Sequence, residues 1–153
     1  MRRQRDYWLM SGEILDYVGT AFIKNDLRRL KKWSSLGQDI YNNYKILIGK
    51  LTDGLLPSIF TSPLGDFITE KKTESTTIYF YKIRVGISSP KLSPSNGARL
   101  IYGVIWEQRK FVPILVYGAF EEGKYYSINN KKLILRKSGL IKIIDEKLKS
   151  VQI

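Results

Sequence analysis

Three cationic residues on two neighbouring predicted strands are the side chains of this sequence best suited to chemistry. Lys82 and Arg84 lie in YFYKIRVGI (79–87), and Arg99 lies in GARLIYGVIWE (97–107). Side chains two positions apart on a strand share a face of the sheet. Lys82 and Arg84 therefore point the same way, and Arg99 joins them if the two strands pair. Fixed ammonium and guanidinium groups of this kind bind phosphate, and Arg does so with two parallel hydrogen bonds.

Cations on strands need an explanation, because burying an unpaired charge in a sheet costs free energy. A single cation is explained by an edge strand that uses charge against aggregation. Three cations on neighbouring strands favour a binding face instead. Ile78 and Phe80 lie on the same face as Lys82 and Arg84. The opposite face can build a core from Tyr79, Tyr81, Ile83 and Val85.

The composition supports a polyanionic partner. The chain has 153 residues, enough for one domain with one core. Lys and Arg number 26 against 14 Asp and Glu, a net charge of +12. This excess favours nucleic acid first, an anionic membrane surface second and an acidic protein third. The alternative is a solvated basic surface with no fixed partner.

Several residue types and motifs are missing from the sequence. The absence of Cys and His excludes disulfides, Cys-based zinc sites and the usual general base. Phosphate-loop, dinucleotide-binding and nucleophile-elbow motifs are also absent, and we expect neither a metal nor a cofactor. No apolar run approaches the roughly 20 residues of a membrane span. We therefore expect no membrane association and a soluble cytoplasmic protein, with residues 1–10 as a flexible basic arm and 11–153 as one domain.

The first half of the chain predicts a strand followed by a helical hairpin. The strand covers 12–22, and the first helix covers 26–33 with an apolar stripe that leaves Arg28, Lys31 and Lys32 on its basic face. Such a face is more often solvated than binding. Apolar residues then repeat with the helical period of 3.6 over 36–51. Gly54 and Pro57 end this second helix.

The second half predicts an antiparallel meander and a final helix. Pro, Gly, Ser and Thr in 57–75 are typical of a loop. The sequence then predicts strands over 76–87, 98–107 and 110–119, with a loop over 88–97. Residues 127–150 are expected to be helical, with Leu140, Ile144 and Leu148 as the apolar stripe and a break at Gly139.

Four segments resemble the RelE/ParE toxin superfamily. FIKNDLRRLKK (22–32) is similar to its opening strand and basic helix, and YKIRV (81–85) with GARLIY (97–102) is similar to its central pair of strands. ILVYGAF (114–120) resembles the next strand in the HigB-like branch. The resemblance runs from about Glu13 to Tyr126. It implies an α+β fold, with an N-terminal strand and helical hairpin packed on a small, mainly antiparallel, twisted sheet. An additional helix follows at the C-terminus.

The same resemblance implies a function. Members are toxins of type II toxin–antitoxin pairs, and many are mRNA interferases, ribosome-dependent endoribonucleases that need no cofactor. The implied partners are an acidic cognate antitoxin, mRNA and the ribosome. Cleavage by attack of the 2′-hydroxyl on the adjacent phosphate requires positioning, proton transfer and stabilisation of negative charge on the phosphorane.

Positions in the resemblance also assign roles to residues. Arg99 matches the strand Arg that stabilises the transition state, and Lys82 and Arg84 match paired basic positions for phosphate binding or proton transfer. Tyr125 is expected to be catalytic by moving a proton or stacking on a base. The expected RNA-binding residues are Lys124, Tyr126, Arg28, Lys31 and Lys32.

Two alternatives stay open. The ParE branch inhibits DNA gyrase without cleaving RNA. The stretch 118–122 favours that branch, because it lacks the cation usual in ribonucleases and carries Glu121 and Glu122. The third alternative is a non-toxic basic module that binds nucleic acid with a steep salt dependence.

Overall fold

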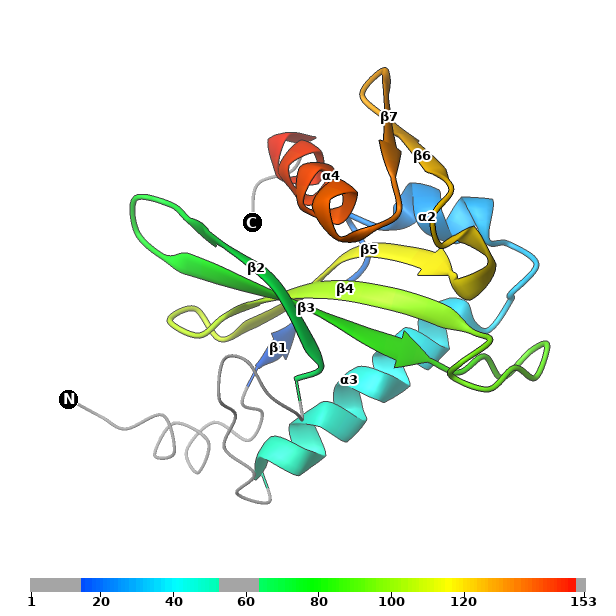
Figure 1. The fold of residues 1–153 in the computed structure, drawn as a ribbon. Helices are drawn as coiled ribbons and strands as arrows, with labels where there is room; N and C mark the ends of the chain where they lie inside the picture. The colour runs from blue at the N-terminus through cyan, green and yellow to red at the C-terminus, as the bar shows by residue number, and fades with distance from the viewer. Residues whose placement is uncertain (1–14, 53–63, 151–153) are drawn as a thin grey trace.

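A mixed five-stranded sheet in the order β1-β5-β4-β3-β2 forms the centre of the structure (Figure 1). The computed structural model describes residues 15–52 and 64–150, so the expected basic arm lies outside the described residues. Strand β1 runs parallel to β5, and the other neighbours are antiparallel. The strands are β1 (Asp16–Tyr17), β2 (Asp66–Lys72), β3 (Thr77–Val85), β4 (Ala98–Ile105) and β5 (Lys110–Gly118).

Two long helices cover opposite faces of this sheet. Helix α3 (Leu36–Thr52) packs on one face and α4 (Lys137–Ser150) on the other (Figure 1). The short helix α2 (Lys24–Arg29) packs against β5. The 3₁₀ turn η1 (Ala119–Glu121) leads to a separate hairpin of β6 (Tyr125–Ile128) and β7 (Lys131–Ile134). The α+β class and the mainly antiparallel sheet are confirmed.

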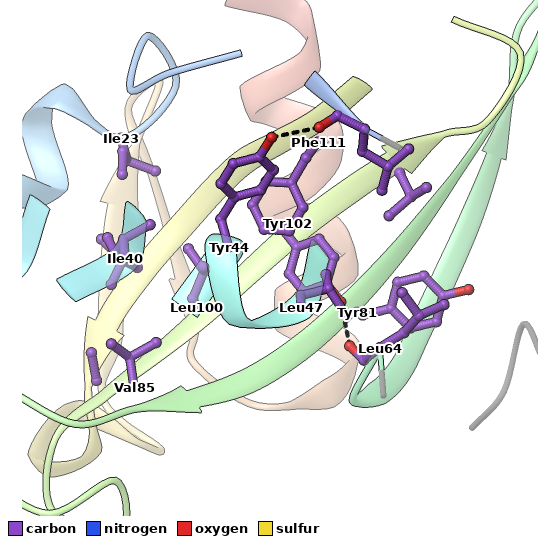
Figure 2. Packing of buried hydrophobic residues seen from close by; sticks show 14 of the residues in the cluster. Ile23, Ile40, Tyr44, Leu47, Leu64, Tyr81, Val85, Leu100, Tyr102 and Phe111 are labelled. Atoms are coloured by element: carbon purple, nitrogen blue, oxygen red, sulfur yellow. Dashed lines mark hydrogen bonds between the residues drawn. The ribbon is translucent and has the colours of Figure 1, made fainter. Parts of the chain in front are cut away.

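The core under α3 is built from the apolar helix stripe that the sequence predicts. Figure 2 shows Tyr44 and Leu47 of α3 over Tyr102 and Phe111 of the sheet. The rings of Tyr102 and Phe111 stack with centroids 4.4 Å apart. The Tyr44 hydroxyl donates to the Leu15 carbonyl at 2.5 Å, which ties the segment before β1 to the helix.

A second core lies under α4. Ile78 and Phe80 of β3 are buried there, together with Leu140 and Ile144 of the predicted helix stripe. The face of β3 that carries the cations is therefore apolar at one end and charged at the other. Ile78 and Phe80 hold β3 in the core, and Lys82 at the other end of the same face is left available to a site.

The predicted loop over 57–75 is wrong for Asp66–Lys72, because this segment forms β2 and pairs with β3. Strand β2 is an edge strand with one partly exposed face, so its apolar content is low. The first predicted strand, 12–22, is also too long. Within the described residues it ends at Tyr17, and Gly19 follows with φ of +100° before a turn. Helix α2 likewise ends at Arg29 instead of continuing to residue 33.

The prediction of helix over 127–150 is wrong for its first part, which forms β6, β7 and their turn. Asn129 and Asn130 both have positive φ, 48° and 63°, as a two-residue hairpin turn of the primed type requires. Gly139 does not break the helix. It lies in the first turn of α4, where an added Cβ would stand 1.8 Å from the carbonyl oxygen of Ile134. Gly is therefore needed for close packing of α4 on β7.

Candidate functional site

The strand register brings the predicted cations to one face. Arg84 of β3 lies directly opposite Arg99 of β4, and Lys82 lies opposite Ile101. Tyr117 of β5 is in turn opposite Arg99. Because side chains on neighbouring strands at paired positions share a face, Arg84, Arg99 and Tyr117 form a row across three strands. The prediction that Arg99 joins the face of Lys82 is confirmed.

Arg99 is buried, with 5% of its surface exposed. Its Nε donates to Glu122 Oε1 at 2.8 Å, and its terminal nitrogens donate to the carbonyls of Pro94 at 2.9 Å and Ser95 at 3.0 Å. A longer bond of 3.3 Å reaches the carbonyl of Ala98. Arg99 therefore holds the loop before β4 and orients the carboxylate of Glu122.

The start of the same loop is held by the buried carboxylate of Asp39 in α3. It accepts hydrogen bonds from the hydroxyl of Ser35 at 2.7 Å and from the hydroxyl and amide of Ser88 at 2.6 and 2.9 Å. Burial alone would raise the pKa of Asp39, but these hydrogen bonds hold it below its ordinary value. Both ends of the loop are thus fixed beside the cationic face.

Lys82 and Arg84 differ from Arg99 because neither has an ion pair or hydrogen bond to its side chain among the residues that the structure describes. Arg84 is exposed and Lys82 is half-buried. Together with Arg99 they line a hollow of about 620 Å³, which also receives Lys50 from α3. These two side chains are available to a ligand, whereas Arg99 is already engaged.

A second hollow, of about 700 Å³, adjoins the first at Lys82. Both hollows are lined by Lys82 and by the carboxylates of Asp66 and Glu122. The second hollow extends toward the amino end of α4, where Arg136 and Lys137 line it. The candidate site is therefore a pair of adjoining hollows with Lys82 between them.

The two acids at the end of β5 are both paired. Glu121 receives two hydrogen bonds from Arg29, from Nε at 3.0 Å and from a terminal nitrogen at 3.1 Å, and it also accepts the amide of Gly118 at 2.9 Å. Glu122 pairs with Arg99 at 2.8 Å. Each carboxylate therefore has a neighbouring guanidinium that compensates its charge.

Tyr125 and Tyr126 lie in a different hollow, of about 550 Å³, which shares no lining residue with the two around Lys82. Tyr125 is 72% exposed. Tyr126 is buried, and its hydroxyl donates to Asp26 Oδ1 at 2.5 Å. Burial and the charge of Asp26 raise the pKa of Tyr126. The structure does not place these tyrosines in the hollows of Lys82.

The remaining predicted RNA contacts lie on the surface. Arg28, Lys31 and Lys32 are exposed, and the ammonium of Lys124 lies 5.7 Å from the ring centroid of Phe120. None of these cations lines the hollows described above. They extend the basic surface at the α2 end of the molecule, and their RNA-binding role stays a prediction.

Sequence reasoning missed a buried ionic network centred on Asp26. This fully buried carboxylate accepts four hydrogen bonds: from Arg29 at 2.8 Å, Tyr126 at 2.5 Å, the amide of Val116 at 3.2 Å and the ammonium of Lys147 at 3.0 Å. Burial lowers the pKa of Lys147. One signal was present in the sequence: Lys147 falls on the apolar stripe of α4, where a cation must find a buried partner.

The network is structural in character because its charges are paired and hydrogen-bonded. Lys147 also donates to the carbonyl of Phe22 at 2.6 Å, so it joins α4 to the turn before α2. The network fixes α2, and through Arg29 it fixes Glu121 just before the site.

Within residues 15–52 and 64–150, no group of three or more carboxylates could hold a metal ion, and no helix is long and apolar enough to cross a membrane. The fold and site define an α+β protein whose mixed sheet carries a cationic end between two hollows. Comparisons with protein-family models, curated proteins and solved structures find no match to this chain.

Proposed function

We propose that this protein is a RelE-like toxin of a type II toxin–antitoxin pair that cleaves mRNA on the ribosome. The observation that carries the proposal is the pair of unpartnered cations, Lys82 and Arg84, beside Arg99 on one sheet face and at the wall of a hollow of about 620 Å³. This arrangement suits a phosphodiester, because two cations on a rigid strand can contact both free oxygens of one phosphate.

The proposed chemistry is attack of a ribose 2′-hydroxyl on the adjacent phosphate, which forms a 2′,3′-cyclic phosphate and breaks the bond to the 5′-oxygen; that oxygen takes a proton from water and leaves as a hydroxyl. Lys82 and Arg84 stabilise the negative charge that develops on the phosphorane. Proton transfer needs a base, and His is absent from the chain. We assign this role to Glu122, which lines both hollows and is oriented by Arg99, as a general base must be. Arg99 acts through Glu122 and the loop it holds.

The proposal ranks the ribonuclease above the gyrase inhibitor for a specific reason. The acids at 121 and 122 favoured the inhibitor because they would repel RNA. In the structure each is compensated by a guanidinium, that of Arg29 or Arg99. We propose that a short acidic antitoxin, encoded beside the gene, covers the cationic face in the inactive complex.

The test replaces Lys82 and Arg84, which are half-buried and exposed. Arg99 is not replaced, because it is buried and its replacement would disturb the fold as well as the chemistry. Lys82→Gln and Arg84→Gln are each expected to abolish growth arrest on expression and to lower mRNA cleavage in a translating extract. Lys72→Gln, which removes an exposed cation from neighbouring strand β2, is the matched control and keeps both activities. Wild-type cleavage by both site variants would overturn the assignment.

A carboxylate variant separates chemistry from binding. Glu122→Gln keeps an oxygen that accepts from Arg99 but cannot take a proton, so cleavage is expected to fall by about 100-fold or more while RNA binding persists. Glu74→Gln, at an exposed turn position, is the control. Inhibition of DNA supercoiling without mRNA cleavage would instead support the gyrase inhibitor, and salt-sensitive RNA binding without growth arrest would support the non-toxic module.

A further inference from the structure

The hollow at the amino end of α4 has features that cleavage at Lys82 and Arg84 does not use. Its volume is about 700 Å³, and three cations line it: Lys82 from β3, and Arg136 and Lys137 from the start of the helix. Helix α4 is 14 residues long and lies on the face of the sheet opposite α3 (Figure 1). The positive end of its dipole is at Lys137.

Cations at the start of a helix oppose its dipole, and acids are the usual choice there. In α4 the first turn contains no acid, and neither Arg136 nor Lys137 has a side-chain partner within the described part of the chain. The guanidinium of Arg136 lies over Gly123, 3.4 Å from where a Cβ would stand. Positive groups concentrated against a positive helix end indicate that an anion compensates them.

Tyr117 provides an independent observation. It is 1% exposed, it lines this hollow, and its hydroxyl has no hydrogen-bond partner among the described residues. Burial and the nearby charge of Glu122 raise the pKa of Tyr117 to about 12, so the hydroxyl stays protonated and can donate. Glu122 lines the same hollow, which places the hydroxyl end of the ring on this side. Among the described residues, the fully buried side-chain polar atoms without a partner are the hydroxyls of Tyr17 and Tyr81, so the Tyr117 hydroxyl is accessible from the hollow and can donate to a ligand there.

We propose that this hollow binds a phosphate group, which receives hydrogen bonds from Tyr117, Lys82, Arg136 and Lys137 at the amino end of α4. Two carboxylates also line the hollow. Glu122 is compensated by Arg99, whereas Asp66 is exposed and leaves one negative charge at the rim. This balance favours a singly charged phosphodiester over a doubly charged free phosphate.

The phosphate chemistry follows from this geometry alone, while its assignment to RNA rests on the proposed function. Because the two hollows meet at Lys82, one strand crossing both would place consecutive phosphates in them. The hollow at α4 then holds the phosphate next to the one that is cleaved. It supplies the positioning that a ribonuclease without a metal requires.

The test measures binding of an oligonucleotide that cannot be cleaved, with 2′-O-methyl sugars, by fluorescence anisotropy at several salt concentrations. The double variant Arg136→Gln/Lys137→Gln is expected to weaken binding at least tenfold and to reduce the slope of log K against log salt by about 1.4. Tyr117→Phe keeps the ring and is expected to weaken binding about tenfold. Lys142→Gln removes an exposed cation from the same helix and is expected to bind as wild type does.

Arg136 and Lys137 are exposed, so their replacement tests binding without disturbing the core. Binding by the double variant equal to that of Lys142→Gln would show the proposal to be wrong. Titration with inorganic phosphate, followed by amide chemical shifts at Lys137 and Ser138, gives the second measurement. Shifts with inorganic phosphate but no binding of the oligonucleotide would support the phosphate site and overturn its assignment to RNA. Since no cleavage is measured, an inactive wild type would refute the proposed function without affecting this result.

Discussion

Replacing Asp26 with Asn is expected to lower the free energy of unfolding more than any surface change in this protein. The variant keeps the shape of the side chain and removes its charge. The ammonium of Lys147, 3.0 Å from Asp26 and nearly buried, then has no anion beside it, while Arg29 still has Glu121. Breaking a buried ion pair by removing one partner costs about 3–5 kcal/mol, because the remaining charge stays out of water.

This cost is large compared with the stability of a domain. A typical domain unfolds with a free energy of about 5–15 kcal/mol. A loss of about 3–5 kcal/mol is therefore a large fraction of the total stability. For a chain of this size each kcal/mol shifts the melting temperature by about 2–4 °C, which predicts a fall of about 6–20 °C for Asp26→Asn.

Urea unfolding followed by tryptophan fluorescence and circular dichroism measures the loss. The double variant Asp26→Asn/Lys147→Met removes the orphaned charge and is expected to recover more than half of it. Asp145→Asn is the control, because its carboxylate is half exposed and pairs with Lys71 at 2.8 Å, so about 1 kcal/mol or less is expected. The reasoning would be refuted by an Asp26→Asn loss below about 1 kcal/mol, or by no recovery in the double variant.

Two further predictions concern pH and packing. Hydrogen bonds led by that of Lys149 lower the pKa of Glu146 to about 2 from its ordinary 4.5. The folded pKa is the lower one, so this stabilisation is present above pH 4.5 and is lost as the pH falls toward 2. Urea unfolding between these pH values should show a fall in the free energy of unfolding of the wild type and a smaller fall in Glu146→Gln. The same pH dependence in both proteins would contradict the prediction. Gly139→Ala places a Cβ against the Ile134 carbonyl and is expected to destabilise by about 2 kcal/mol or more. Gly49→Ala, in an open helical position, is expected to stabilise by about 0.5–1 kcal/mol; thermal melts that reverse this order would show the packing argument to be wrong.

The shared face of Lys82, Arg84 and Arg99 could be predicted because it depends only on strand alternation and pairing. Helix α3 could be predicted because its apolar positions repeat with period 3.6. These features are local, or they follow from a single pairing. The helical interpretation of 127–136 failed although its turn carried a signal, since Asn-Asn at 129–130 is typical of a primed hairpin turn.

Which of the three cations is buried and paired, and which are available to a ligand, could not be predicted from the sequence. Arg99 is buried because carbonyls at 94 and 95 and the carboxylate of Glu122 converge on it, and that convergence depends on tertiary structure. Tyr117 showed no pattern in the sequence, because an unpartnered hydroxyl is defined by what is missing around it. Strand β2 was missed because edge strands alternate weakly and tolerate polar residues on both faces.

The network of Asp26 also bears on when the fold can be completed during synthesis of the chain. Asp26 and Lys147 are separated by 121 positions, and β1 pairs with β5 between Asp16 and Lys110. At about 5–20 residues per second, the ribosome needs about 6–24 s to reach Lys147 after Asp26 has been made. Until then Asp26 lacks its ammonium partner, and Arg136 and Lys137 of the phosphate hollow are also absent for most of that time. This order of synthesis means that the pair of Asp26 and Lys147, and the side of the hollow that Arg136 and Lys137 line, can form only after α4 has been made.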